Sequence, residues 1–175
     1  MPSALSDSSF TARRGRVWPW LLVSLAIIAA DQFTKWWVRQ DLPLDSSHPV
    51  TGFFNLVYIH NPGAAFSFLA SAPGWQRWFF TALSLAASLF ILWLMFRNRG
   101  KPLFNLALAC ILGGALGNVI DRVLWGKVTD FLDFYITLNG QQWHWPAFNL
   151  ADSALFIGAM LLIVDELRRA RQHRS

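Results

Sequence analysis

The sequence contains little cysteine and little charge for its length. Cys110 is the only cysteine in 175 residues and lies inside an apolar run, so one chain can form neither a disulfide bond nor a cysteine-based metal site. Cys110 reads as a small buried apolar residue. Charged residues make up 14% of the chain, well below the roughly 25% of ordinary soluble domains. A chain of this size and composition is at most one compact domain and a candidate membrane protein.

Common catalytic motifs are also missing. No pair among His48, His60, His144 and His173 has the His-x-x-x-His spacing of a helical zinc site. No glycine-rich loop with a lysine is present to cradle phosphate. No Gly-x-Ser-x-Gly elbow is present, although a serine–histidine pair assembled in space, with Ser153 for example, stays open. We therefore expect no metal and no cofactor, which leaves carboxylates as the main catalytic candidates.

Apolar residues make up 54% of the chain and are concentrated in long segments. About 20 such residues cross a bilayer as a helix. We predict spans at 17–38, 78–96, 103–122 and 147–165. The first segment ends near Ala30 like a secretory signal peptide, but its apolar character resumes directly afterwards and three more spans follow. The sequence thus predicts an all-α membrane protein, a four-helix transmembrane bundle in a single domain.

The basic residues indicate how the predicted spans are oriented. The net charge of +5 is also compatible with nucleic-acid binding, but the arginines and lysines cluster in three short segments, 1–16, 97–102 and 165–175. Basic loops remain on the cytoplasmic side of a membrane. Four spans place all three segments there, so we expect both termini in the cytoplasm and no nucleic acid as a partner. The connectors 39–77 and 123–146 then lie on the extracytoplasmic side.

The two connectors differ in character. Residues 50–59 are rich in β-branched and aromatic side chains, and Asn61-Pro62-Gly63 follows as a turn signal. We predict one strand there and a returning strand at 64–69, which form a small sheet at the membrane surface. The tryptophans of the second connector suit a membrane interface, and its part from 126 to 146 is a candidate lid.

Polar residues gather near the outer ends of the predicted spans. Gly113 and Gly117 share one helix face, which lets a second helix approach closely. The outer ends of three spans and one connector carry Asp31, Lys35, Asn118, Asp121, Arg122, Asp130, Asn149 and Asp152. Charged groups are costly in a membrane and usually mark a functional site. Two carboxylates held close together share a proton and can activate a water for amide hydrolysis.

Structural roles are the alternative for most of these residues. Side chains four residues apart on a helix form ion pairs, and polar residues at helix starts act as caps. The residue types alone favour an ion pair for Asp31 and Lys35, anchoring of other segments for Asp121 and Arg122, a turn for Asn61-Pro62-Gly63, and capping for Asn149 and Asp152.

Five stretches of the sequence together resemble the motifs of a known family. They are Asp31-Gln-Phe-Thr-Lys35, Asn61-Pro-Gly-Ala-Ala-Phe66, Gly113-Gly-Ala-Leu-Gly-Asn118 with Asp121-Arg122, Val128-Thr-Asp-Phe131 and Phe148-Asn-Leu-Ala-Asp152. Each stretch alone is weak evidence for a family. In this order and on these spans, however, they make the chain similar to bacterial lipoprotein signal peptidases, also called signal peptidase II. The resemblance implies a catalytic dyad at Asp130 and Asp152. It implies supporting or substrate-binding roles for Asp31, Lys35, Asn61, Gly63, Asn118, Asp121, Arg122, Asn149 and Ala151.

The same resemblance implies the activity and the fold. It implies an aspartyl endopeptidase of the bacterial cytoplasmic (inner) membrane, a four-span bundle with a small extracytoplasmic β-cradle, and a site near the extracytoplasmic face. The substrates would be diacylglyceryl-modified prolipoproteins embedded in membrane lipid and cut just before the lipidated cysteine, and the inhibitor would be the cyclic peptide globomycin. Asp133 would face away from Asp130 in an extended segment, and the match to Val-x-Asp-Phe selects Asp130.

Two other classes of protein stay open from the residues alone. A proton-coupled carrier would use the carboxylates as a relay, although the polar groups stop at the outer leaflet. A non-catalytic assembly protein would use the glycine face for helix association, but it has no use for the outer carboxylates.

Overall fold

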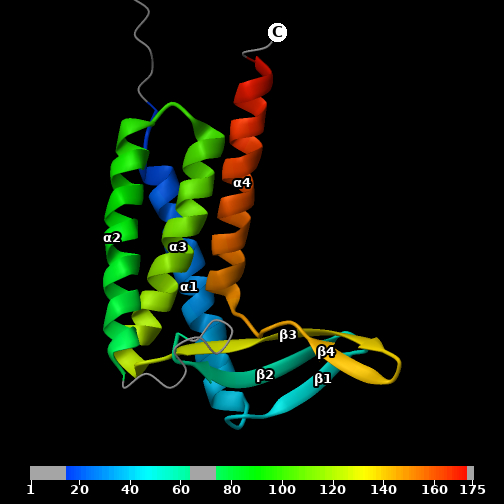
Figure 1. Ribbon diagram of the computed structural model, residues 1–175. Coiled ribbons are helices and arrows are strands. Elements are labelled where there is room, and N and C mark those ends of the chain that lie inside the picture. The colour runs from blue at the N-terminus through cyan, green and yellow to red at the C-terminus, as the bar shows by residue number, and fades with distance from the viewer. Residues whose placement is uncertain (1–14, 64–73, 173–175) are drawn as a thin grey trace, which may run out of the picture.

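The computed structural model describes residues 15–63 and 74–172. It contains the helices α1 (Trp18–Asp41), α2 (Trp75–Arg97), α3 (Pro102–Trp125) and α4 (Leu150–Gln172), and the strands β1 (Ser47–Thr51), β2 (Phe54–Asn61), β3 (Val128–Leu138) and β4 (Gln141–His144). The helices lie side by side, and the strands form a sheet across one end of the bundle that extends sideways beyond it (Figure 1).

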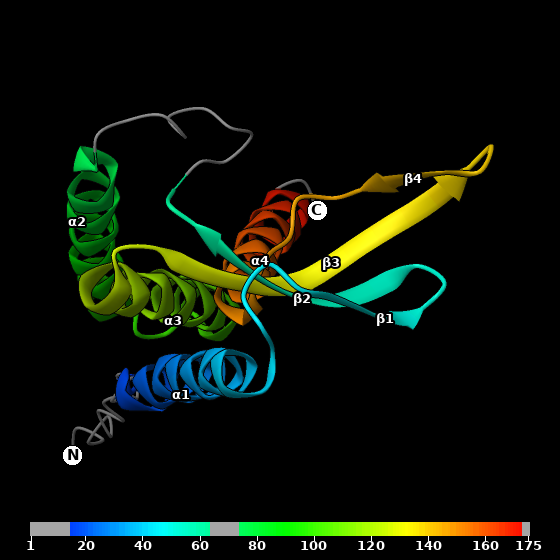
Figure 2. The ribbon, with the colours of Figure 1, turned by 90° about the horizontal axis from the view of Figure 1, so that it is seen from below.

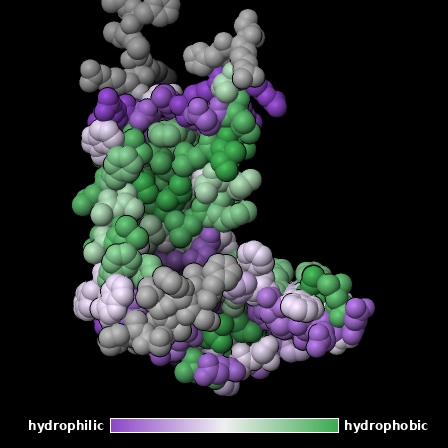
Figure 3. Space-filling model, viewed as in Figure 1, coloured by the Kyte–Doolittle hydropathy of each residue, from purple (hydrophilic) through white to green (hydrophobic). Residues whose placement is uncertain are grey.

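The helices form an apolar body of membrane-spanning length. Among the described residues, α1, α2 and α3 are long and apolar enough to cross a membrane. Figure 3 shows the corresponding band of apolar surface, with hydrophilic residues gathered at both ends of the bundle. α4 is of similar length but is not among these three helices, because Asp152 interrupts its apolar segment at one end and Asp165 and Glu166 at the other. The structure is therefore that of a mostly helical membrane protein with a small antiparallel sheet.

The predicted boundaries of the helices need correction. The predicted ranges 17–38, 78–96 and 103–122 are one to three residues too short at every end of α1, α2 and α3 except the start of α1. The prediction that the last helix starts at Ala147 is wrong, because the backbone of Phe148 exchanges hydrogen bonds with Leu132 of β3 at 2.9 and 3.0 Å. This isolated bridge ties the start of α4 to the sheet, and the helix begins at Leu150.

α3 is the central helix. It contacts each of the other three helices, and 61% of its most apolar segment is buried, against 22% for α1 and for α2. Glycines allow these contacts: a Cβ atom on Gly113 would lie 2.9 Å from Ser24 O of α1, and one on Gly114 would lie 2.4 Å from Ala151 O of α4. The sequence-based expectation that Gly113 and Gly117 face a second helix is confirmed, since a Cβ on Gly117 would meet Asp31 of α1.

The sheet is a meander of four antiparallel strands in the order β1-β2-β3-β4. β3 starts beside the end of α3, passes α4 and continues beyond the bundle (Figure 2). The single strand predicted at 50–59 is wrong, because the chain turns between Thr51 and Phe54 and forms a hairpin. The hairpin of β3 and β4 turns at Asn139-Gly140, which both have positive φ angles, as the tight turns of hairpins require. The returning strand predicted at 64–69 lies outside the described residues.

Gly158 of α4 offers a test of the close packing between α3 and α4. A Cβ atom there would lie 2.5 Å from Ile111 Cγ1 and 2.7 Å from Ala107 O. Because the backbone oxygen cannot move away without shifting α3, Gly158→Ala should destabilise the protein by about 1–3 kcal/mol. Thermal unfolding in detergent measures this loss. Gly52→Ala is the matched control, since no atom lies within 4 Å of its added Cβ, and equal melting temperatures for the two variants would contradict the packing.

Candidate active site

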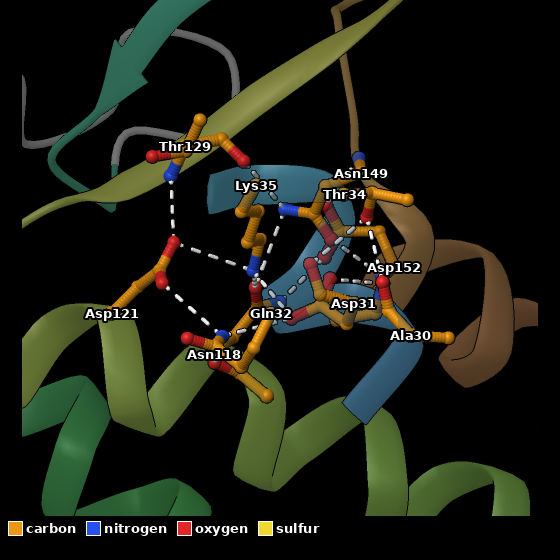
Figure 4. A network of polar contacts seen from close by, with 12 residues as sticks. Ala30, Asp31, Gln32, Thr34, Lys35, Asn118, Asp121, Thr129, Asn149 and Asp152 are labelled. Atoms are coloured by element: carbon orange, nitrogen blue, oxygen red, sulfur yellow. Dashed lines mark hydrogen bonds and ion pairs between the residues drawn. The ribbon is translucent and has the colours of Figure 1, made fainter. Parts of the chain in front are cut away.

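A buried network of charged side chains joins α1 to α3 at the sheet end of the bundle (Figure 4). Lys35 Nζ lies 2.9 Å from Asp31 Oδ2 and 3.3 Å from Asp121 Oδ2, and all three side chains are fully buried. Lys35 also donates to Asn118 Oδ1 at 2.9 Å. The predicted ion pair between Asp31 and Lys35 is confirmed. Arg39, one turn further along α1, lies 2.9 Å from Asp121 Oδ1, so two carboxylates balance two cations.

Asp121 and Asp31 also hold the backbone of the neighbouring elements. Asp121 Oδ2 accepts the backbone N–H of Thr129 at 2.9 Å, at the start of β3. Asp31 Oδ1 accepts the backbone N–H of Ala151 at 2.9 Å, in the first turn of α4. A carboxylate that accepts a backbone N–H at this distance makes a strong, charge-assisted hydrogen bond. The charge network of α1 and α3 therefore positions the two segments that carry Asp130 and Asp152.

Asp130 is 2% exposed, and two asparagines hold its carboxylate. Asn149 Nδ2 donates to Asp130 Oδ1 at 2.7 Å, and Asn61 Nδ2 donates to Asp130 Oδ2 at 3.0 Å. Asn61 is itself fixed by a tight turn, because its Oδ1 accepts the backbone N–H of Gly63 at 2.9 Å. The Asn61-Pro62-Gly63 segment is thus a turn, as predicted, and also a support for Asp130.

Asp152 lies in the first turn of α4 and is held from two sides. Asn118 Nδ2 donates to Asp152 Oδ1 at 2.8 Å. Asn149 caps the helix: its Oδ1 accepts the backbone N–H of Asp152 at 2.9 Å, and Asp152 Oδ2 accepts the backbone N–H of Asn149 at 3.3 Å. This reciprocal pair is a capping box with Asp in place of Glu. Capping by Asn149 is therefore confirmed, and Asn149 contacts both Asp130 and Asp152.

The surroundings of Asp130 change its acidity. Burial, and after it the negative charge of nearby Asp152, raise the pKa of Asp130 to about 7, against the hydrogen bonds from Asn61 and Asn149, which lower it. A carboxyl group with a pKa in this range can take up or release a proton near neutral pH. The arrangement fits acid–base chemistry on a water molecule.

A groove of about 450 Å³ lies beside Asp152. It is lined by Trp145, Phe148, Asp152, Ser153, Phe156 and Ile157. Phe156 and Ile157 are exposed on the surface of α4, so the groove connects the carboxylate to the apolar face of the bundle. An apolar ligand carried by the membrane can approach Asp152 along this groove.

Arg122 and Asp133, the remaining charged candidates, differ in their position relative to Asp130 and Asp152. The Arg122 guanidinium lies 5.6 Å from the centre of the Phe80 ring on α2. It is close enough to Asp152, Asp130 and Asp121 to interact with their charges. Asp133 does not join this site, because it contacts Asn55 at 2.8 Å and His144 at 2.9 Å.

Ser153 and the metal-ligating residue types complete the description of the site. Ser153 donates its hydroxyl to the backbone oxygen of Asn149 at 3.0 Å, as a structural serine does. Within residues 15–63 and 74–172, no cluster of three or more His, Cys, Asp or Glu side chains that could hold a metal ion is found.

The structure adds three residues that sequence reasoning missed. Gln32 Nε2 donates to Gly117 O at 3.0 Å and to Asp121 Oδ1 at 3.2 Å. Arg39 donates to Thr129 Oγ1 at 3.0 Å in addition to its ion pair. Arg39 could have been found, because it lies four residues after Lys35 on the same helix face. The bond between Thr129 and Asp121 offers no such signal, since it uses the backbone N–H of Thr129.

Comparisons with known proteins give a consistent result. Residues 23–168 match the family described as signal peptidase (SPase) II. The chain is 53% identical over 180 residues to a lipoprotein signal peptidase of Cupriavidus taiwanensis, covering 99% of this chain and 100% of that one. It is 58% identical over 156 residues to a lipoprotein signal peptidase of Ralstonia nicotianae, covering 89% and 88%.

Two solved structures, both described as bacterial membrane enzymes determined by the in meso method, resemble the fold. The one at 2.3 Å resolution has a TM-score of 0.77 and 28% identity, covering 90% of this chain and 92% of its own. The one at 1.9 Å has a TM-score of 0.75 and 29% identity, covering 88% and 96%. Together with the matched family and the near-full-length relatives, they show that the chain belongs to the signal peptidase II family of membrane peptidases.

Proposed function

We propose that this chain is an aspartyl endopeptidase that removes the signal peptide from diacylglyceryl-modified prolipoproteins, cleaving on the N-terminal side of the lipidated cysteine. Asp130 and Asp152 are the catalytic dyad and activate the attacking water. The observation that carries the proposal is that one residue, Asn149, hydrogen-bonds both carboxylates, through its side chain to Asp130 and its backbone to Asp152. The relatives named lipoprotein signal peptidase support the substrate class.

The chemistry follows from one proton shared by two carboxylates. The ionised member takes a proton from a bound water, and the oxygen of that water attacks the carbonyl carbon of the scissile amide. The protonated member donates a hydrogen bond to the carbonyl oxygen, which becomes part of a tetrahedral intermediate. A proton from the dyad then passes to the amide nitrogen, the C–N bond breaks, and the lipidated cysteine leaves with a free amine. The pKa of Asp130, raised to about 7 by burial and by Asp152, supports a shared proton under neutral conditions.

Other polar residues hold the dyad in place without reacting. Amide groups are suited to this role, because they donate hydrogen bonds and do not titrate. Asn118 holds Asp152, and Asn61 holds Asp130 from the turn that Gly63 closes. Arg122 supplies a positive charge near the dyad. The fully buried trio of Asp31, Lys35 and Asp121 has a supporting role, and Asp31 acts through the backbone of Ala151.

The architecture supports a site at the outer surface of the bacterial cytoplasmic (inner) membrane. α4 serves as the fourth span, packed along α3. Both described chain ends lie at the end of the bundle opposite the sheet (Figure 1), where Arg97, Arg99 and Lys101 also lie. Such basic segments remain in the cytoplasm, which puts the sheet and the dyad on the extracytoplasmic side. The apolar groove beside Asp152 admits a substrate anchored in lipid, and a globomycin-type inhibitor would compete for it.

Replacement of either dyad member should abolish cleavage. In Asp130→Asn and Asp152→Asn the water loses its acid–base partner, which should slow the reaction by about 10²–10⁴-fold. Purified protein is incubated with a precursor peptide carrying a diacylglyceryl cysteine, and the product is quantified by mass spectrometry. Asp133→Asn is the matched control from the same strand, because Asp133 contacts Asn55 and His144 instead of the dyad. Undiminished cleavage by either dyad variant would refute the assignment.

The rate of cleavage should fall as the pH rises above about 7. Deprotonation of Asp130, whose pKa is raised to about 7, leaves two ionised carboxylates and no proton for the carbonyl oxygen. Asn61→Ala removes a hydrogen bond that lowers this pKa, so the alkaline fall in rate should move to higher pH. The measurement is the pH profile of kcat for both proteins. A profile that stays in place, or moves to lower pH, would contradict the shared proton.

The proposed orientation predicts which surfaces are accessible from outside the cell. In a Cys110→Ala background, Gln142→Cys on β4 should react with a membrane-impermeant maleimide in intact spheroplasts. Gly100→Cys, at the opposite end of the bundle, should react only after permeabilisation. Both positions are exposed, so their difference reports orientation. The reverse labelling pattern would overturn the proposed topology.

A further inference from the structure

A second pocket lies where the ends of α1 and α3 meet the sheet. Its volume is about 340 Å³. It is lined by Trp36, Arg39, Gln40, Tyr58, His60, Trp125 and Lys127. None of these residues lines the groove beside Asp152, and none was singled out as a site residue by sequence motifs. We refer to it as the basic pocket.

Positive charge accumulates in the basic pocket. Arg39 is balanced by Asp121, which it contacts at 2.9 Å. Lys127 is half-buried, and in the described part of the chain no hydrogen bond or ion pair of its ammonium group is found. Burial and the charges of Lys127 and Arg39 lower the pKa of His60, while Asp45 acts in the opposite direction. His60 is therefore neutral at neutral pH, and Lys127 is the unbalanced cation of the pocket.

The basic pocket lies at the depth of lipid headgroups. From Trp18 to Arg39 the α1 helix rises by about 32 Å at 1.5 Å per residue, which matches a hydrocarbon thickness of about 30 Å. Trp36 and Trp125, at the ends of α1 and α3, are 55% and 57% exposed, as tryptophans at a membrane boundary are. The Arg39 guanidinium lies 5.2 Å from the centre of the Trp125 ring, so the cation is held beside the lipid-facing indole.

We infer that the basic pocket binds the phosphate of an anionic phospholipid from the leaflet that borders the sheet. Lys127 supplies the charge, and Arg39 is positioned beside it by Asp121 and Trp125. Tyr58 and His60, which are hydrogen-bonded to each other at 3.2 Å, line the same pocket and can bind phosphate oxygens. Free phosphate offers the same chemistry, but the exposed indoles of Trp36 and Trp125 also provide an apolar surface for acyl chains. A basic pocket at this depth is a recognised kind of lipid headgroup site.

The test uses the full-length protein in a neutral detergent with three probes: dioleoyl phosphatidylglycerol, dioleoyl phosphatidylcholine and inorganic phosphate. Native mass spectrometry and thermal unfolding measure binding. We expect phosphatidylglycerol to bind more tightly than phosphatidylcholine, and inorganic phosphate to produce no comparable shift at equal concentration. Lys127→Gln should weaken phosphatidylglycerol binding about fivefold, the contribution of one basic residue near a membrane surface. Lys127→Arg should restore it.

Lys101→Gln is the matched control, since it removes an exposed lysine at the opposite end of the bundle, and it should bind phosphatidylglycerol like the wild type. Circular dichroism is used to check whether each variant is folded. Equal affinity for the two lipids, unchanged binding by Lys127→Gln, or an equal shift with inorganic phosphate would each overturn the lipid site. If Lys127→Gln does not fold, Lys127→Arg together with the comparison of the three probes still decides.

Discussion

The structure depends on the charge balance between α1 and α3. Asp31, Lys35 and Asp121 are fully buried, in a bundle whose other interior residues are largely apolar. Isolated charges are not tolerated there, and removal of one member of such a pair costs about 3–5 kcal/mol. The two helices must therefore pack in the one register that brings these groups together. Glycines at positions 113, 114 and 117 let the backbones come close enough for this register.

The same charged side chains also hydrogen-bond to β3 and α4. Asp121 also accepts the backbone N–H of Thr129 in β3, and Asp31 accepts that of Ala151 in α4. Thr129 is the direct neighbour of Asp130 and Ala151 that of Asp152, the two aspartates of the proposed dyad. A charge pair inside the bundle thus determines where two separate segments place their carboxylates. Within the described parts of the chain, no lysine forms an ion pair with Asp130 or Asp152, as the proposed shared proton requires.

Much of this arrangement could be predicted from the sequence, and the parts that could not have physical reasons. The helices follow from the length of the apolar runs. The ion pair of Asp31 and Lys35 follows from their spacing on one helix face, and the cap at Asn149 follows from an asparagine at a helix start. For the hairpin of β3 and β4, Asn139-Gly140 is a recognisable sequence signal. The start of α4 could not be predicted, because it depends on backbone hydrogen bonds between Phe148 and Leu132. The role of Thr129 is equally hidden, since any residue with an N–H would make the same bond.

Asn149 has a consequence for the time at which the enzyme becomes competent. It caps the last helix of the chain and at the same time hydrogen-bonds Asp130, which was synthesised 19 residues earlier. Before α4 is synthesised, Asp130 lacks the hydrogen bond from Asn149 and keeps only the one from Asn61, and Asp152, the second carboxylate of the proposed dyad, is absent. The proposed proteolytic activity therefore requires that α4 has been synthesised and has packed against α3.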